Sequence, residues 1–230
     1  MTTITAKKPL DGCEFCDEFA NGVNNKFYAR YGSNLRSRLV LASENFRVFP
    51  SIGQLVEGYT LVAPVTHYAA IDEVPPSLLA ECRHVYRQVK ESISDIYGQC
   101  LCYEHGARDQ NSGGCGIYHA HLHVVPFEAY PDPIAKLKEL FPYKRLKAFD
   151  DMRPLTENLS SYLFYEDMES NRYLFLSGKL PSQYMRRLLA ETIGTADWDW
   201  RSAGKEERLL ATTRRLADYF DNCGSRFAAP

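Results

Sequence analysis

Apolar and polar residues alternate along the stretch from His119 to Val125, and a period of two is typical of a β-strand. Three of the six histidines of the chain, His119, His121 and His123, therefore share one face of the expected strand. The apolar residues between them point to the opposite face. We expect that apolar face to enter a core. We expect the histidine face to line a site, because three partly buried imidazoles cost more desolvation than packing alone would select.

The rest of the first half shows the pattern of short strands around one long helix. Apolar residues repeat at helical spacing between Pro76 and Gly98, behind two prolines that suit a first helical turn. Strand-like runs occupy Leu39–Leu41, Phe46–Phe49, Tyr59–Val65 and Gln99–Glu104. The first two are predicted to pair as a hairpin. The last is predicted to be an antiparallel neighbour of the histidine strand.

After Pro126 the pattern changes to prolines, short helices and aromatic strands. It predicts helices at Ile134–Leu140, from Leu180 and at Glu206–Phe220, a strand at Tyr143–Phe149, and a hairpin of Tyr162–Tyr165 with Tyr173–Leu176. We therefore predict a domain of residues 1–130 and a C-terminal extension of residues 131–230 that packs on it.

The composition is that of a folded globular protein, with 45% hydrophobic and 13% aromatic residues among 230. A formal net charge of -2 gives no overall attraction to nucleic acid or to an anionic membrane, so we expect neither as a partner. The first residues lack the apolar run of a signal peptide, and no later stretch approaches a membrane span. We therefore expect a cytoplasmic protein.

A glycine-rich turn lies just before the histidine strand, at the end of a polar loop that reaches Ser112, and we expect Ser112 to contact the phosphate or nucleotide together with this turn. Gly113, Gly114 and Gly116 let backbone N–H groups approach a ligand closely and surround an anion. Imidazoles beside such a turn suggest phosphate chemistry.

A second candidate for anion binding is the helix that begins after Pro181. Its first amides, together with Ser182 and Gln183, can hold an anion. Arg186 and Arg187 follow in the next turn. They fit an anion contact and a solvated helix face equally well.

Cys13 and Cys16 form a Cys-x-x-Cys pair near the N-terminus of a chain with seven cysteines. In a cytosolic protein this spacing favours a metal site over a disulfide framework, and the pair can place two thiolates on one zinc ion. The pair precedes a loop rich in Asn and Gly rather than lying in a βαβ unit, which disfavours a redox role. The remaining metal ligands must come from elsewhere in the chain.

Residues 119–125 fit, in every position, the His-φ-His-φ-His-φ-φ signature (φ, apolar) of the histidine triad (HIT) superfamily, which this chain resembles. The Cys-x-x-Cys pair and Glu57–Tyr68, which looks like the family's "GH-LVIP-KH" strand, support the resemblance over roughly residues 13–126. It implies an α+β fold, with a HIT-like antiparallel sheet core and a long helix after the His67 strand, to which residues 131–230 would add a C-terminal α/β extension. It also implies a homodimer that binds a nucleotide and cleaves or transfers at the α-phosphate.

The resemblance further implies one structural zinc ion per chain. In zinc-bearing members, including the galactose-1-phosphate uridylyltransferase branch, the ligands correspond here to Cys13, Cys16, His67 and His119. Two thiolates and two imidazoles complete a tetrahedral set and leave no open position for water.

The same resemblance implies that the middle histidine, His121, is the nucleophile and that His123 donates a hydrogen bond to the phosphate or leaving group. Main-chain amides of Gly114, Cys115 and Gly116 would bind the non-bridging oxygens. Small hydrolases of the family have Ser or Thr where this chain has Gly116, and Asn where it has Glu104. Glu104 is therefore predicted to act on a leaving group or a sugar hydroxyl, and hydrolase and transferase both stay open.

Two other functions compete with this one. In the first, His119 and His121 chelate a catalytic metal ion, as His-x-His pairs do in β-barrel metalloproteins. In the second, the chain is an adaptor that binds a nucleotide without turnover.

Overall fold

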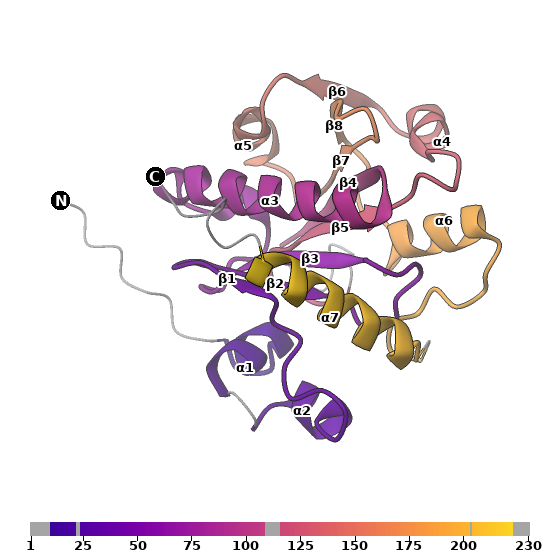
Figure 1. The fold of residues 1–230 in the computed structure, drawn as a ribbon. Helices are drawn as coiled ribbons and strands as arrows, with labels where there is room; N and C mark the ends of the chain where they lie inside the picture. Colours follow the sequence, from indigo (N-terminus) through magenta and orange to yellow (C-terminus); the bar gives the residue numbers. More distant parts are fainter. Residues whose placement is uncertain (1–9, 22–23, 109–115, 203, 223–230) are drawn as a thin grey trace.

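The computed structural model describes residues 10–21, 24–108, 116–202 and 204–222, and its described strands form one antiparallel sheet (Figure 1). The strand order is β1-β2-β3-β5-β4-β7-β8-β6. The strands are β1 (Leu41–Ala42), β2 (Phe46–Pro50), β3 (Thr60–Pro64), β4 (Cys100–Ala107), β5 (Leu122–Pro126), β6 (Tyr143–Leu146), β7 (Ser161–Glu166) and β8 (Arg172–Phe175). The α+β prediction, the first hairpin and the pairing of β4 with β5 are confirmed.

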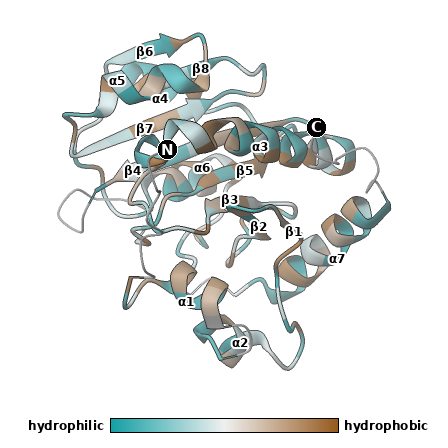
Figure 2. Ribbon diagram, turned by 90° about the vertical axis from the view of Figure 1, so that its left-hand side faces the viewer, coloured by the Kyte–Doolittle hydropathy of each residue, from teal (hydrophilic) through white to brown (hydrophobic). Residues whose placement is uncertain are grey.

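Helices cover both faces of this sheet. They are α1 (Glu14–Asn21), α2 (Lys26–Tyr31), α3 (Pro76–Tyr97), α4 (Ile134–Leu140), α5 (Arg153–Thr156), α6 (Tyr184–Ile193) and α7 (Glu206–Asn222), with 3-10 turns η1 (Ile71–Glu73) and η3 (Phe149–Met152). One core cluster joins the sheet to α3 and α7, and a second, on the opposite face, joins it to α1, α4 and α6. The central strands β3 and β5 between these layers are mostly hydrophobic (Figure 2).

The long helix α3 forms as its pattern predicts. Its apolar stripe, which includes Val85, Val89 and Ile93, is fully buried against the sheet. The helix ends at Gly98, whose φ of +84° disfavours residues with a Cβ, and a Cβ there would also collide with the Glu128 carboxylate.

The sheet crosses the boundary that we predicted at residue 130. Strand β7 pairs with β4 from Cys102↔Glu166 to Ala107↔Ser161, and β8 and β6 continue the sheet beyond it. The C-terminal strands therefore extend the first sheet by hydrogen bonding as well as by packing. The predicted strand at Tyr143–Phe149 ends early, at Leu146, because η3 begins at Phe149.

No helix in the described ranges is long and apolar enough to cross a membrane.

Candidate active site and metal centre

The histidine stretch lies at the centre of the sheet, where β5 is flanked by β3 and β4. Ala120, Leu122 and Val124 lie in the α3 core, so the predicted alternation is confirmed. The strand itself is shorter than predicted and begins at Leu122, because the preceding backbone turns to a loop: the Ala120 N–H donates to Tyr68 O at 2.7 Å. This contact brings His119 beside the segment that carries His67.

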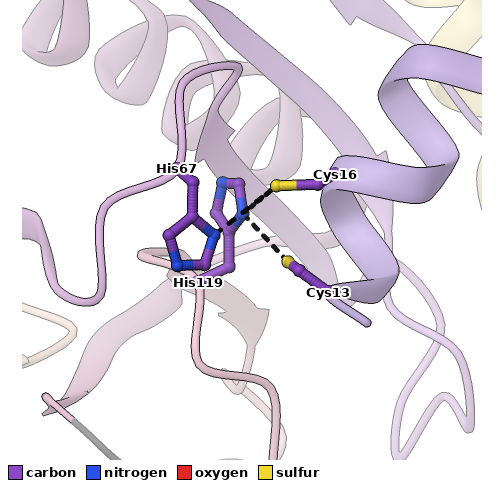
Figure 3. A group of neighbouring side chains, drawn as sticks. All are labelled: Cys13, Cys16, His67 and His119. Carbon is purple, nitrogen blue, oxygen red and sulfur yellow. Dashed lines mark hydrogen bonds between the residues drawn. The ribbon is translucent and has the colours of Figure 1, made fainter. Parts of the chain in front are cut away.

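Two cysteines and two histidines from three segments converge beside α1 (Figure 3). Cys13 directly precedes α1 and Cys16 lies in its first turn, His67 comes from the loop after β3, and His119 from the stretch before β5. The four candidate ligand atoms lie within 4.8 Å of one another. The His119 Nδ1 atom lies 3.4 Å from Cys13 Sγ and 3.6 Å from Cys16 Sγ, and His67 Nδ1 lies 3.5 Å from Cys16 Sγ.

These distances fit a tetrahedral metal centre. Zinc bonds of about 2.3 Å to sulfur and about 2.0–2.1 Å to nitrogen, at the tetrahedral angle, separate S and N by about 3.5 Å. His119 Nε2 also donates to Pro64 O at 2.8 Å, which places the imidazole proton on Nε2. Nδ1, which faces the thiols, therefore keeps the lone pair that can bind a metal ion. The residues present therefore suit a Zn²⁺ ion with a closed ligand set.

His121 is oriented differently from His119. Its Nδ1 donates to the carbonyl oxygen of His119 at 2.6 Å, so Nε2 carries the lone pair. Burial lowers the pKa of His121 to about 4, which keeps the imidazole neutral at pH 7. The Phe15 ring meets this imidazole edge to face, with centroids 5.3 Å apart. A fixed, neutral imidazole with a free Nε2 can act as a nucleophile.

Two tyrosines hold His123. The Tyr59 hydroxyl lies 2.8 Å from His123 Nδ1 and forms a short hydrogen bond with the Tyr103 hydroxyl. The Tyr103 ring stacks on the imidazole with centroids 4.2 Å apart and an interplanar angle of 8°. These contacts hold His123 beside His121, and the two imidazole centroids are 4.6 Å apart.

A cavity of about 30 Å³ lies beside His121 and His123. That volume holds about two water molecules. Arg38, Arg186 and Trp200 also line it. Trp200 belongs to the loop between α6 and α7, which therefore forms part of the wall of this cavity.

Glu104 lies on the opposite face of the sheet from His121 and His123. Its carboxylate accepts from Ile71 N–H at 2.7 Å and from the Tyr162 hydroxyl at 2.6 Å, on the side that packs against α3. Strand alternation explains this, because Glu104 shares a face with Cys100 and Cys102, whereas Tyr103 faces His123. The structure does not bring Glu104 to the phosphate side.

Burial raises the pKa of Glu104 from 4.5 to about 8. Between these two pH values the folded chain keeps a proton that the unfolded chain has lost, so the free energy of unfolding falls as pH rises through this window. We expect Glu104→Gln to remove this loss of stability. At pH 8 its free energy of unfolding should exceed that of wild type by an amount on the order of a few kcal/mol. Urea unfolding at pH 5 and pH 8 measures it, with the exposed Glu207→Gln as control. An equal pH dependence in wild type and Glu104→Gln would contradict the assignment.

The structure places only some of the other predicted phosphate contacts, and their role stays a prediction. Ser112, Gly114 and Cys115 lie outside the described residues. Gly116 has a φ of +84°, and its carbonyl accepts from Arg201 at 3.3 Å. Ser182 is exposed.

Gln183 is buried, and its side chain contacts the loop between α6 and α7. Its side-chain Nε2 donates to Asp199 Oδ1 at 2.8 Å, and its Oε1 accepts from Trp200 N–H at 3.2 Å. Gln183 therefore holds the loop that carries Trp200 in place.

His105 belongs to the site although the sequence analysis gave it no role. It lies two residues beyond Tyr103 on the same face of β4, and strand alternation counted from Tyr103 would have found it. Neither ring nitrogen has a hydrogen-bond partner in the described chain. Burial, with a further contribution from His121, lowers the pKa of His105 to about 4.

Comparison with known proteins places the similarity in the first half of the chain. A family model described as HIT domain matches residues 33–129. The curated protein "Protein hit" of Bacillus subtilis (strain 168) is 26% identical over 96 residues, and the match spans 40% of this chain and 63% of that protein.

Solved structures with similarity include a hypothetical histidine triad nucleotide-binding protein from Sulfolobus tokodaii strain7, which is 24% identical with a TM-score of 0.38 over 50% of this chain and 68% of that one. A Zn-bound histidine triad family protein from Mycobacterium smegmatis is 23% identical, with a TM-score of 0.35 over 50% of this chain and 74% of that one. The HIT domain match ends before α4, so the family model does not include the C-terminal strands and helices.

Proposed function

We propose that this chain binds a nucleotide conjugate and cleaves or transfers at its α-phosphate, with His121 as the nucleophile; the match of a HIT domain model to residues 33–129 supports this proposal. The observation that carries the proposal is the hydrogen bond from His121 Nδ1 to His119 O, which leaves Nε2 unprotonated. Nε2 attacks the phosphorus, and the bond from phosphorus to the leaving group breaks. Water or another acceptor then attacks the nucleotidyl-histidine, and the imidazole leaves.

In this proposal His123 supplies a hydrogen-bond donor. In the proposed arrangement the Tyr59 hydroxyl donates to His123 Nδ1, the imidazole proton is on Nε2, and Nε2 donates to a phosphate oxygen of the substrate. The stacked Tyr103 ring holds the imidazole in place, so the donor is oriented before substrate arrives.

The proposal includes a structural zinc ion on Cys13, Cys16, His67 and His119, the ligand set of the zinc-bearing and uridylyltransferase members that the sequence resembles. When bound, the ion would join α1 to the strand that carries the triad. The alternative in which His119 and His121 share a catalytic metal is disfavoured, because among the described residues His121 is not part of the cluster. The homodimer stays a prediction.

A substrate panel tests the reaction. Zinc-loaded protein is incubated with nucleoside diphosphate sugars, dinucleoside polyphosphates and nucleoside phosphoramidates, with and without inorganic phosphate. A nucleoside monophosphate released in water indicates a hydrolase, and product that requires phosphate indicates a transferase. Binding with no product from any substrate would favour the adaptor instead.

A nucleotide needs more room than the cavity of about 30 Å³ provides, and we propose that the Trp200 loop moves to admit it. We expect Trp200→Ala to speed the association of a fluorescent nucleotide analogue about 3- to 10-fold, because the open conformation becomes more populated. Stopped-flow mixing measures the rate. Trp198→Ala, which removes the ring stacked on Arg187, is the control. An association rate that Trp200→Ala leaves unchanged would show that the loop does not limit entry.

A further inference from the structure

Helix α6 places a buried cation in the wall of the triad cavity. The Arg186 side chain is 2% exposed. Its Nε donates to Trp198 O at 2.8 Å, and its Nη2 donates to Gly53 O. The third nitrogen, Nη1, is buried and has no hydrogen-bond partner in the described chain. A buried guanidinium with an unused donor is costly unless a ligand completes it.

Arg38, the other arginine in the cavity wall, differs from Arg186 because each of its three guanidinium nitrogens donates a hydrogen bond. Two of its nitrogens donate to the Glu18 carboxylate at 2.8 and 2.7 Å, and the third donates to Pro50 O at 2.7 Å. Arg186 forms no ion pair with any described residue. Its positive charge is therefore not neutralised in the way that Glu18 neutralises Arg38.

Two nearby carboxylates of the described chain, those of Asp199 and Glu14, form no ion pair with Arg186. Asp199 lies close enough for its pKa to be lowered, first by the Gln183 hydrogen bond and to a smaller extent by Arg186. Its Oδ1 already accepts from Gln183 Nε2 and from Arg201 N–H. Glu14, which lines the cavity, is half-buried, and it is not among the ion pairs of the described residues.

The position of Arg186 indicates which part of a substrate it would meet. Its guanidinium lies over the Tyr59 ring, 5.4 Å from the centroid, and the Tyr59 hydroxyl contacts His123 Nδ1. Arg186 is thus on the His123 side of the cavity, whereas the nucleophilic nitrogen belongs to His121. The group that departs from phosphorus is expected on the side away from the nucleophile, because attack and departure are in line.

We propose that Arg186 binds a phosphate in the leaving group of the substrate, so that the chain selects nucleotide conjugates joined through a second phosphate over those joined to a neutral group. The inference rests on the proposed function. When His121 Nε2 bonds to the α-phosphorus, the bond from phosphorus to the bridging oxygen breaks, and its electron pair stays on the departing phosphate. Arg186 Nη1 donates to that phosphate as its negative charge grows. Because α6 lies beyond residues 33–129, this selectivity is a contribution of the C-terminal half.

The experiment compares two substrates with the same nucleoside, a dinucleoside polyphosphate and a nucleoside phosphoramidate. Wild type, Arg186→Gln, Arg186→Lys and Arg187→Gln are measured after zinc content and thermal midpoint have been recorded. Arg187 is the matched control, since it is the next residue on α6 but is exposed. For Arg186→Gln we expect kcat/KM to fall about 10- to 100-fold on the polyphosphate and less than about 3-fold on the phosphoramidate. Arg186→Lys should recover part of the loss because it restores the charge.

Equal losses on both substrates, or no loss on either, would overturn the role of Arg186. A separate measurement does not depend on turnover: titration of inorganic pyrophosphate into wild type should give binding that Arg186→Gln weakens about 10-fold or more and Arg187→Gln does not. Absence of pyrophosphate binding by wild type also overturns the proposal. Failure of the proposed function is distinct, because wild type would then turn over neither substrate.

Discussion

Cys13→Ala, Cys16→Ala and His67→Ala are each expected to purify with little zinc and to unfold at a thermal midpoint lower by roughly 10 °C or more. Structural zinc binding contributes directly to folding free energy, and a chain of this size loses about 2–4 °C per kcal/mol. Each substitution leaves three of the four donor atoms that the structure gathers. The loss of stability should extend beyond α1, because Phe15 on that helix packs against both His119 and His121.

Zinc per chain, measured by elemental analysis, and the thermal midpoint of the same samples test this prediction. Cys82→Ala is the matched control: Cys82 is also a buried thiol, but it lies in the α3 core, away from the cluster. It should keep its zinc and lose only the stability of a small core truncation, about 1–2 kcal/mol. Full zinc content in all three cluster variants would remove the metal site.

The parts of this structure that could be predicted from the sequence are those governed by local periodicity. The helix α3 and the inward face of β5 follow from a repeat of about 3.6 residues and a repeat of two, and both have the predicted orientation. The Cys13–Cys16 pair and its partners His67 and His119 were placed together by family resemblance, since spacing within the pair gives only half of a site.

The orientations of His105 and Arg186 can also be predicted from the sequence when strand and helix periods are counted residue by residue. Counting alternate positions along β4 from Tyr103 puts His105 on the triad face and Glu104 on the other. On α6, Leu189 and Ala190 follow Arg186 by three and four residues, so Arg186 belongs to the buried face, whereas Arg187 is followed at four by the exposed Glu191.

Other features lie beyond local pattern. The pairing of β7 with β4 joins residues more than fifty positions apart, and no period within either strand identifies the partner. The position of Trp200 in the cavity wall depends on Gln183 binding to Asp199 and Trp200, contacts that exist only when α6 and the following loop are folded together.

His121→Ala is expected to fold, keep its zinc and bind nucleotide, yet to turn over at least ~10³-fold more slowly than wild type. Only binding and transition-state hydrogen bonds remain when a nucleophile is deleted. His119→Ala should behave differently and lose metal and stability, since the Nδ1 of His119 lies 3.4 and 3.6 Å from the two thiols, whereas the Nδ1 of His121 donates to a backbone carbonyl. His84→Ala, on α3 and outside the triad cavity, is the control for loss of a histidine.

Rapid quenching with a substrate labelled at the α-phosphate examines the same step directly. Wild type should give an acid-labile, base-stable adduct on His121, as a phosphoramidate requires, and His121→Ala should give none. Zinc content and nucleotide affinity of the two proteins should match, because the Nε2 of His121 is outside the metal cluster. If His121→Ala remains active and wild type forms no adduct, the imidazole pair of His121 and His123 is a binding surface, and the neutral Nε2 has no covalent role.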